Sequence, residues 1–211
     1  MRQRGQILER RLPDYRIESS FHASGHALVA GVDEAGRGPL AGPVACAAVI
    51  LDPEHIPPGL DDSKKLGEAR RDALFDLIMA RALAVSVTLG PAAEIDRLNI
   101  RAATLAAMAR ALRGLALAPA FALIDGRDIP PGLPCPAAAV IGGDAKCCSI
   151  AAASIIAKVT RDRLMRRLDA HAPGYGFARH AGYGVRHHRL AIESLGASPW
   201  HRMSFRPLRQ D

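Results

Sequence analysis

The stretch Val29-Ala30-Gly31-Val32-Asp33-Glu34-Ala35-Gly36-Arg37-Gly38-Pro39 decides how the rest of the chain is interpreted. Its first residues form an apolar run that is typical of a buried strand. Asp33 and Glu34 stand at the end of that strand, which is where mixed α/β sheets place their chemistry. The loop Gly36-Arg37-Gly38 follows, and its glycines let the backbone approach a ligand closely. Paired carboxylates beside such a loop indicate a divalent metal next to phosphate.

A surface Asp-Glu pair before a turn is the alternative interpretation, and this stretch alone leaves it open. Adjacent residues on an extended strand point to opposite faces. Asp33 and Glu34 can therefore serve one site only if the strand end twists or if one of them contributes its backbone carbonyl. Further acidic strand ends are needed before a shared site is inferred.

The composition is that of one globular domain: 211 residues, 49% of them hydrophobic, with a mean hydropathy of +0.04. This length accommodates one full core and is short for two domains. The longest uncharged run covers fifteen residues, 129–143, whereas a membrane-spanning helix needs about 20 apolar residues. No apolar segment follows the arginines of the N-terminus, so neither a membrane span nor a secretory signal is predicted.

The cysteines indicate a reducing compartment. They lack the spacing of zinc ligands and stand in apolar surroundings, at Cys46, Cys135, Cys147 and Cys148. We therefore expect them to be small core residues, and we expect the protein to be cytoplasmic.

The net charge of +7 is concentrated in the last quarter of the chain. Residues 158–211 hold 11 Lys and Arg against 4 Asp and Glu, whereas residues 1–157 hold 17 of each. A basic segment attached to a neutral core is the electrostatic footprint of a polyanion-binding protein. The use of arginine for solubility in a GC-rich genome is an equally good explanation of charge alone.

Strand and helix patterns alternate along the chain. Apolar or alternating runs predict strands over residues 28–33, 44–51, 84–89, 121–126 and 137–141. A period of three to four residues predicts helices over residues 67–82, 94–114, 149–170 and 185–195. Residues 1–27 show no periodicity and are expected to be a loosely docked extension, and residues 174–184 are expected to be a loop. The chain is thus predicted to be an α/β domain, with antiparallel pairing among the first strands.

Three strand or loop ends carry acids that can form one site. Besides Asp33-Glu34, Asp125 precedes Gly126, and Asp144 follows two glycines. If the first and fourth strands are neighbours, Asp33 and Asp125 stand side by side. Crowded carboxylates raise one another's pKa unless a cation neutralises them.

The chemistry that these acids predict is phosphodiester hydrolysis. Oxygen ligands without Cys or His select Mg²⁺ or Mn²⁺. Two such ions suit an in-line displacement at phosphorus, because one activates water and the other stabilises the leaving oxygen.

Several segments of the chain, in the same order, resemble the type 2 ribonucleases H, and specifically bacterial ribonuclease HII. The two longest are residues 31–44, Gly-Val-Asp-Glu-Ala-Gly-Arg-Gly-Pro-Leu-Ala-Gly-Pro-Val, and residues 149–162, Ser-Ile-Ala-Ala-Ala-Ser-Ile-Ile-Ala-Lys-Val-Thr-Arg-Asp. Shorter ones are Asp62-Ser63-Lys64-Lys65-Leu66, Leu123-Ile124-Asp125-Gly126, Gly143-Asp144 and residues 174–183. The resemblance runs from about residue 29 to residue 200.

The resemblance implies a ribonuclease H-like mixed five-stranded sheet flanked by helices, with a basic helical C-terminal segment. The corresponding divisions are an N-terminal extension, a catalytic domain and a substrate-binding segment of the same domain, at residues 1–27, 28–170 and 171–211. The implied activity is endonucleolytic cleavage of RNA in RNA/DNA hybrids and incision 5′ to single ribonucleotides in duplex DNA. These nucleic acids are then the partners of a monomeric enzyme.

The resemblance also implies roles for individual residues. Two Mg²⁺ or Mn²⁺ ions would be held by Asp33, Glu34, Asp125 and Asp144. In the family, Asp33 would bridge both ions and Asp144 would complete the ion on the nucleophile side, with the other two acids on the leaving-group side.

Substrate contacts are implied at three places. The Gly36-Arg37-Gly38 loop would read the ribose 2′-OH, Lys64 would contact a phosphate, and Tyr183 would pack on the sugar at the RNA-to-DNA junction. The chain departs from the family pattern at Ala181, where lysine is usual, and at Val185, where threonine is usual.

The histidines of the basic segment offer a rival metal site. Their spacing is irregular, so we interpret them as solvated or phosphate-facing, at His180, His187, His188 and His201. His188 matches a histidine position of the family.

Two other functions compete with an active ribonuclease. One is a non-catalytic module that binds RNA/DNA hybrids, and the cost of a crowded carboxylate cluster without a function argues against it. The other is a different nuclease of the same fold, such as a junction resolvase or transposase. Preference for DNA containing one ribonucleotide over plain DNA separates these possibilities.

Overall fold

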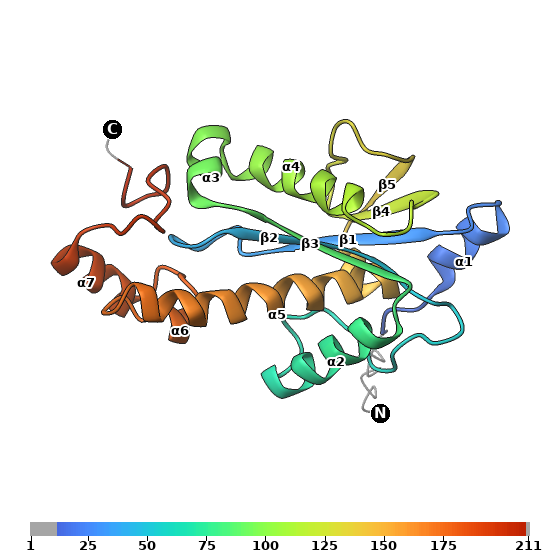
Figure 1. Ribbon diagram of the computed structural model, residues 1–211, viewed down its shortest axis with the longest axis horizontal. Coiled ribbons are helices and arrows are strands. Elements are labelled where there is room, and N and C mark those ends of the chain that lie inside the picture. Colours follow the sequence, from blue (N-terminus) through green and yellow to red (C-terminus); the bar gives the residue numbers. More distant parts are fainter. Residues whose placement is uncertain (1–11, 210–211) are drawn as a thin grey trace, which may run out of the picture.

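The centre of the protein is a five-stranded sheet with the strand order β3-β2-β1-β4-β5, seen in a computed structural model that describes residues 12–209 (Figure 1). The strands are β1 (Val29–Ala35), β2 (Val44–Ile50), β3 (Ala84–Gly90), β4 (Phe121–Asp125) and β5 (Ala137–Val140). β1 pairs antiparallel with β2 and parallel with β4. The predicted mixed sheet is confirmed, and so is the antiparallel pairing of the first strands.

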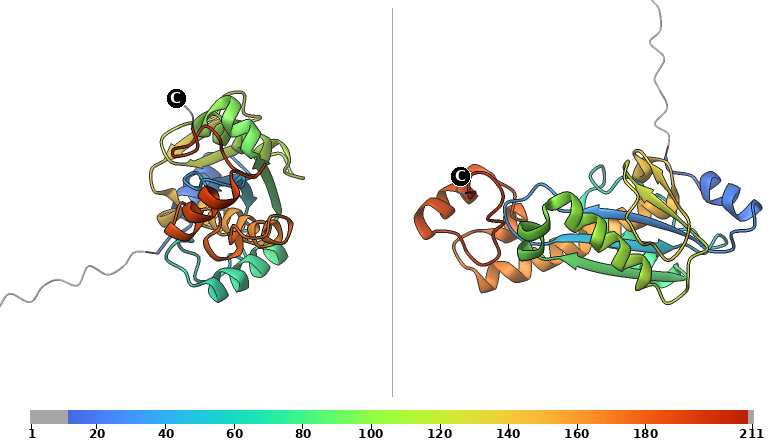
Figure 2. Two further views of the ribbon diagram at one scale, coloured as in Figure 1. Left: turned by 90° about the vertical axis from the view of Figure 1, so that its left-hand side faces the viewer. Right: turned by 90° about the horizontal axis from the view of Figure 1, so that it is seen from above.

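Helices cover both faces of the sheet (Figures 1 and 2). On one face α3 (Ala92–Leu98) and α4 (Ile100–Arg113) pack against alternate residues of β1 and β2. On the other face lie α2 (Glu68–Arg81) and α5 (Cys148–His171). α5 approaches β1 very closely at Gly31, where the lack of a side chain is required, because an added Cβ would lie 2.1 Å from the carbonyl carbon of Ser149.

The helix predicted over residues 94–114 is two helices. Asn99 separates α3 from α4 with a φ of +68°, which is outside the helical region. Its side-chain oxygen accepts a hydrogen bond from the amide of Ala102 at 3.0 Å and so caps α4. The apolar period continues across this break, and for that reason the pattern alone predicted a single helix.

Residues 12–27 contain α1 (Arg16–Ala23), although the sequence showed no helical period there. The buried carboxylate of Glu18 accepts hydrogen bonds from the amide and hydroxyl of Ser149, at 2.8 and 2.7 Å. Phe21 stacks on Phe121 with ring centroids 4.0 Å apart. Contacts with distant residues therefore hold this helix, and the earlier part of the predicted extension lies outside the described residues.

The C-terminal segment forms the end of the molecule opposite α1 (Figures 1 and 2). It contains α7 (Arg186–Leu195), as predicted, and a short helix α6 (Phe177–His180) inside the stretch that was expected to be a loop. Phe177, Tyr175 and Ala191 pack with Met165 and Leu168 of α5. This segment is thereby joined to the same α5 that covers the sheet.

The burial of the cysteines agrees with the expectation that they are small core residues. Cys46, Cys147 and Cys148 are buried free thiols, and Cys135 is half-buried. No helix within residues 12–209 is both long enough and apolar enough to cross a membrane.

Candidate active site

The acids predicted to form one site meet at the carboxyl end of β1. Parallel pairing of β1 with β4 places Val32 opposite Ile124, so Asp33 and Asp125 follow at the same edge of the sheet. Asp144 lies in the short 3₁₀ helix η1 (Gly143–Ala145), next to the end of β4. The amide of Gly143 donates to Oδ1 of Asp125 at 2.7 Å and fixes η1 against that strand.

Burial and, to a smaller degree, mutual repulsion raise the pKa of three of these acids. Asp33 is 4% exposed, and its pKa is well above the ordinary value because of burial and the charges of Glu34 and Asp125. Burial also raises the pKa of Glu34, although the nearby Arg37 opposes this. Charges that repel in this way are stabilised by a bound cation.

The hydroxyl of Ser154 partly offsets this repulsion. It hydrogen-bonds Asp33 and lies 2.9 Å from the hydroxyl of Ser63. Asp33 also accepts the amide of Glu34 at 2.7 Å. The buried acid is therefore held in place before any ligand arrives.

Asp62 is a further acid in this cluster that sequence reasoning did not assign to it. The pKa of Asp144 is raised by burial, by the charge of Asp62 and by that of Asp125, and Asp62 shares a hydrogen bond with Asp144. Asp62 also accepts the amide of Lys64 at 2.9 Å, in the turn that precedes α2. In the sequence, the one signal for a place in the cluster was that Asp62 directly precedes Ser63 and Lys64, in a segment that resembles the family.

Lys64 is a cation that interacts with several acids of the cluster. Burial would lower its pKa, but the charges of Asp62, Asp33, Asp144 and Glu34 outweigh burial and raise it. An ammonium group beside several carboxylates is well placed to meet a phosphate that enters with metal ions.

Within residues 12–209, no three His, Cys, Asp or Glu side chains are arranged to hold a metal ion unaided. Mg²⁺ commonly binds through one or two carboxylates, several waters and substrate phosphate oxygens. An oxygen-only donor set with raised pKa values fits ions of that kind, which complete their coordination with the substrate.

The predicted substrate residues line a cavity of about 450 Å³ beside the acids. Glu34, the Gly36-Arg37-Gly38 loop, Lys64 and Tyr183 all border this cavity, as do Lys158 and Arg161 of α5. Asp125 instead borders a smaller hollow that it shares with Glu34. Glu34 is therefore the acid that joins the carboxylate cluster to the cavity.

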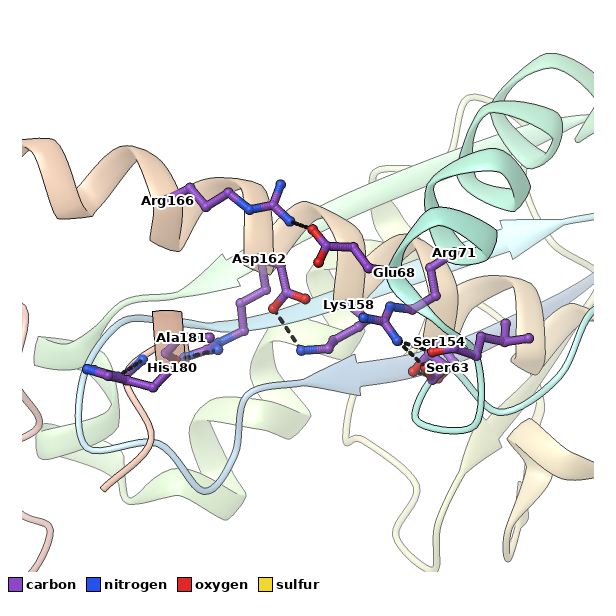
Figure 3. Close-up of polar contacts among 12 residues, drawn as sticks. Ser63, Glu68, Arg71, Ser154, Lys158, Asp162, Arg166, His180 and Ala181 are labelled. Atoms are coloured by element: carbon purple, nitrogen blue, oxygen red, sulfur yellow. Dashed lines mark hydrogen bonds and ion pairs between the residues drawn. The ribbon is translucent and has the colours of Figure 1, made fainter. Parts of the chain in front are cut away.

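Beyond Lys158 and Tyr183 lies a second hollow of about 270 Å³, between α2, α5 and α6. Figure 3 shows the ion pairs at its rim: Lys158 donates to Asp162 at 2.8 Å, and Arg166 pairs with Glu68. On the cavity side, Arg71 donates to the carbonyl of Ser63 at 3.0 Å. Basic side chains thus continue from the cavity along α5.

Two of the C-terminal histidines do not fit the solvated or phosphate-facing interpretation. His188 is fully buried and His201 is 2% exposed, because they pack with the aromatic ring of Phe177. Apolar packing across the segment, which spacing cannot reveal, made that interpretation wrong for this pair.

Comparisons with known proteins agree with one family. The family model described as Ribonuclease HII matches residues 30–208. A curated Ribonuclease HII from Sinorhizobium fredii is 58% identical over 203 residues, which are 96% of this chain and 87% of that protein.

Solved structures share the fold. An RNase HII from Archaeoglobus fulgidus, solved in complex with PCNA, has a TM-score of 0.71 at 30% identity, covering 87% of this chain and 97% of its own. Bst-RNase HIII in complex with Mn²⁺ has a TM-score of 0.61 at 20% identity, covering 89% and 70%.

Proposed function

The chain belongs to the ribonuclease HII family of endoribonucleases, which act on RNA/DNA hybrids, and from this premise we propose that it also incises duplex DNA 5′ to single embedded ribonucleotides. The observation that carries the proposal is the junction at Glu34 between a crowded carboxylate cluster and a cavity bordered by a glycine loop and a tyrosine.

For the chemistry, we propose that Asp33, Glu34, Asp125 and Asp144 would hold two Mg²⁺ or Mn²⁺ ions. The ions would supply activation of water and neutralisation of charge on the leaving oxygen. The burial and repulsion that raise the pKa of Asp33 and Asp144 support this assignment. Lys64 would place the phosphate beside the acids.

For substrate choice, we propose that Gly36-Arg37-Gly38 reads the 2′-OH and that Tyr183 packs on the neighbouring sugar. The amides of Arg37 and Gly38 donate to no group in residues 12–209 and are therefore available to a ligand. The Tyr183 ring is 44% exposed, and its Cε1 lies 3.8 Å from the position of a Cβ built on Gly38. Loop and ring thus face the same small space.

The direct test is cleavage of a labelled duplex that carries one ribonucleotide in DNA, with Mg²⁺, with Mn²⁺ and with chelator. We expect one metal-dependent cut 5′ to the ribonucleotide and none in an all-DNA duplex. Binding without a cut under either metal would favour the non-catalytic module. A cut in all-DNA duplex would favour another nuclease of the same fold.

We further propose that the enzyme works as a cytoplasmic monomer. The packing of the C-terminal segment against α5 joins cavity and acids within one chain, so no second copy is required to complete the site. Light scattering at working concentration tests this, and a dimer mass would contradict it.

A further inference from the structure

The Gly36-Arg37-Gly38 loop is held from beneath by a buried arginine of the C-terminal segment. Arg202 is fully buried, and its guanidinium donates to the carbonyls of Gly36, Arg37 and Gly42. The distances are 2.6, 2.8 and 2.9 Å, respectively. Backbone bonds add to this contact, since the amide of Arg202 donates to Leu40 and that of Gly42 to Trp200, both at 2.8 Å.

A second buried arginine, in α5, holds the residues that follow this loop and a residue just before Tyr183. Arg161 donates to the carbonyls of Ala41, Pro43 and Ala181, at 3.1, 2.9 and 2.9 Å. Every hydrogen bond that the two guanidiniums donate within the described chain goes to a main-chain carbonyl. Because the carbonyls of Gly36 and Arg37 are turned toward Arg202, the amides of Arg37 and Gly38 remain free of partners in residues 12–209.

His201, the neighbour of Arg202, is linked to Tyr183 on the other side of the cavity. The amide of Ser198 donates to Nδ1 of His201 at 2.9 Å, so the proton of neutral His201 is on Nε2. That Nε2 lies 3.1 Å from Nε2 of His188, which must then accept. Nδ1 of His188 consequently carries a proton and donates to the carbonyl of Tyr183 at 2.9 Å.

Burial keeps this chain of hydrogen bonds in one protonation state. It lowers the pKa of both imidazoles, that of His201 to about 4. Both rings are therefore neutral at physiological pH, and the direction of each hydrogen bond is fixed.

We propose that His201 and Arg202 are positioning residues that set the loop Gly36-Arg37-Gly38 and Tyr183 at the separation needed to recognise a ribonucleotide. Two adjacent side chains reach the two walls of one cavity, Arg202 directly and His201 through His188. This inference rests on the proposed function, because it assigns a task to the loop and to the ring.

The first test measures discrimination in binding, so that it does not depend on turnover. Affinities for a duplex with one ribonucleotide and for the all-DNA duplex are compared in Ca²⁺. For Arg202→Met, we expect the ratio of the two affinities to fall about tenfold, with the affinity for all-DNA duplex within about twofold of the unchanged protein; tenfold corresponds to about 1.4 kcal/mol.

Two controls separate positioning from general destabilisation. Glu18→Ala removes a buried hydrogen-bonding carboxylate of α1, the helix at the other end of the molecule from the C-terminal segment, and should lower the melting temperature without changing the ratio. Arg202→Lys keeps the charge and loses the fork of donors, so it should fold and lower the ratio at least about threefold. A ratio unchanged in both Arg202 variants would overturn the inference.

The second test concerns His201. Gln can retain a donor toward His188, whereas Leu cannot, so His201→Gln should restore most of the discrimination that His201→Leu loses on junction-containing duplexes. Equal loss in both variants would mean that His201 only fills space. If the unchanged protein itself does not discriminate, the proposed function fails; if it does and the variants keep the ratio, only the positioning role fails.

Discussion

The four acids at the end of β1 and the two arginines beneath the neighbouring loop are both groups of like charge in a small volume. The acids have few internal partners, and burial with mutual repulsion raises the pKa of Asp33 and Asp144. The arginines repel as well, since burial and Arg161 lower the pKa of Arg202 to about 9. Their charge, however, is met by carbonyl oxygens at every hydrogen bond described above.

The difference teaches how a site can be distinguished from a scaffold. A cluster whose charge is left uncompensated inside the protein requires an external ligand, whereas a compensated cluster fixes structure. By this criterion the acids are where cations and phosphate are expected, and the arginines hold the loop that lies beside them.

The strongest way to break the comparison is Asp33→Asn. Loss of one carboxylate from the proposed metal-binding cluster should remove about 4 kcal/mol of transition-state stabilisation, which is roughly a thousandfold in rate. Binding should be retained, and the metal-free protein should melt no lower than before because a repelling charge is gone. Cleavage assays, duplex binding and thermal melting check this, and a protein that no longer folds would make Asp33 structural.

Gly36→Ala tests the close packing of the loop on the buried arginines. Gly36 has a φ of +93°, and an added Cβ would lie 1.9 Å from Nε of Arg161. We expect the loop to shift and the rate on single-ribonucleotide duplex to fall about a hundredfold, since a misplaced positioning element can cost that much.

A matched control exists for this variant. Gly25 has a φ of +90°, and nothing lies within 4 Å of its added Cβ, so Gly25→Ala carries the same backbone strain without the collision. Equal losses of activity in the two variants would show that strain, and not the contact with Arg161, is responsible.

Tyr183→Ala sharpens the comparison at the edge of the cavity. A lost sugar contact of about 1–3 kcal/mol corresponds to about 5- to 150-fold in affinity, and we expect it mainly on junction-containing duplexes. Tyr183→Phe, which keeps the ring, should lose little. The measurement is kcat/KM on junction duplex and on long hybrid. A uniform loss on both substrates would contradict a role at the junction.

The smallest expected effect is on thermal stability. Because the folded pKa of Asp33 and Asp144 is raised, the metal-free fold is favoured below the unfolded value of about 4 and loses this contribution as pH rises through the raised pKa. A divalent ion at tenfold its Kd should restore about 1.4 kcal/mol, or roughly 3–6 °C in Tm.

The measurement is scanning calorimetry with Mg²⁺ and with chelator at two pH values. The gain from the ion should be larger at pH 8 than at pH 5 and should be absent in Asp33→Asn. A gain of the same size at both pH values would argue that the ion binds elsewhere.

The sheet and the acid cluster were predictable because their signals are local. Apolar runs mark strands, and an acid that ends such a run must lie at the sheet edge, so Asp33 and Asp125 met as expected once β1 and β4 were neighbours. Asn99 was missed because one left-handed residue interrupts a helix without disturbing its apolar period.

The scaffold was not predictable because its partners are remote in sequence. Arg202 contacts Gly36 across 166 positions, and Glu18 contacts Ser149 across 131. In the sequence, a buried arginine that bonds to carbonyls is identical to a solvated one that faces nucleic acid. Asp62 shows the same limit on a smaller scale, since its place in a segment that resembles the family was visible and its hydrogen bond with Asp144 was not.

The 166 positions between Gly36 and Arg202 also determine how long the loop waits for this arginine during synthesis. Ribosomes add about 5–20 residues per second, so the loop is made on the order of ten to thirty seconds before the residue that holds it. A growing chain can already contain β1, β4 and their acids while the Gly36-Arg37-Gly38 loop still lacks the residue that holds it. On the proposed role of Arg202, the part of the site that recognises a ribonucleotide is therefore completed only after the acids have been made.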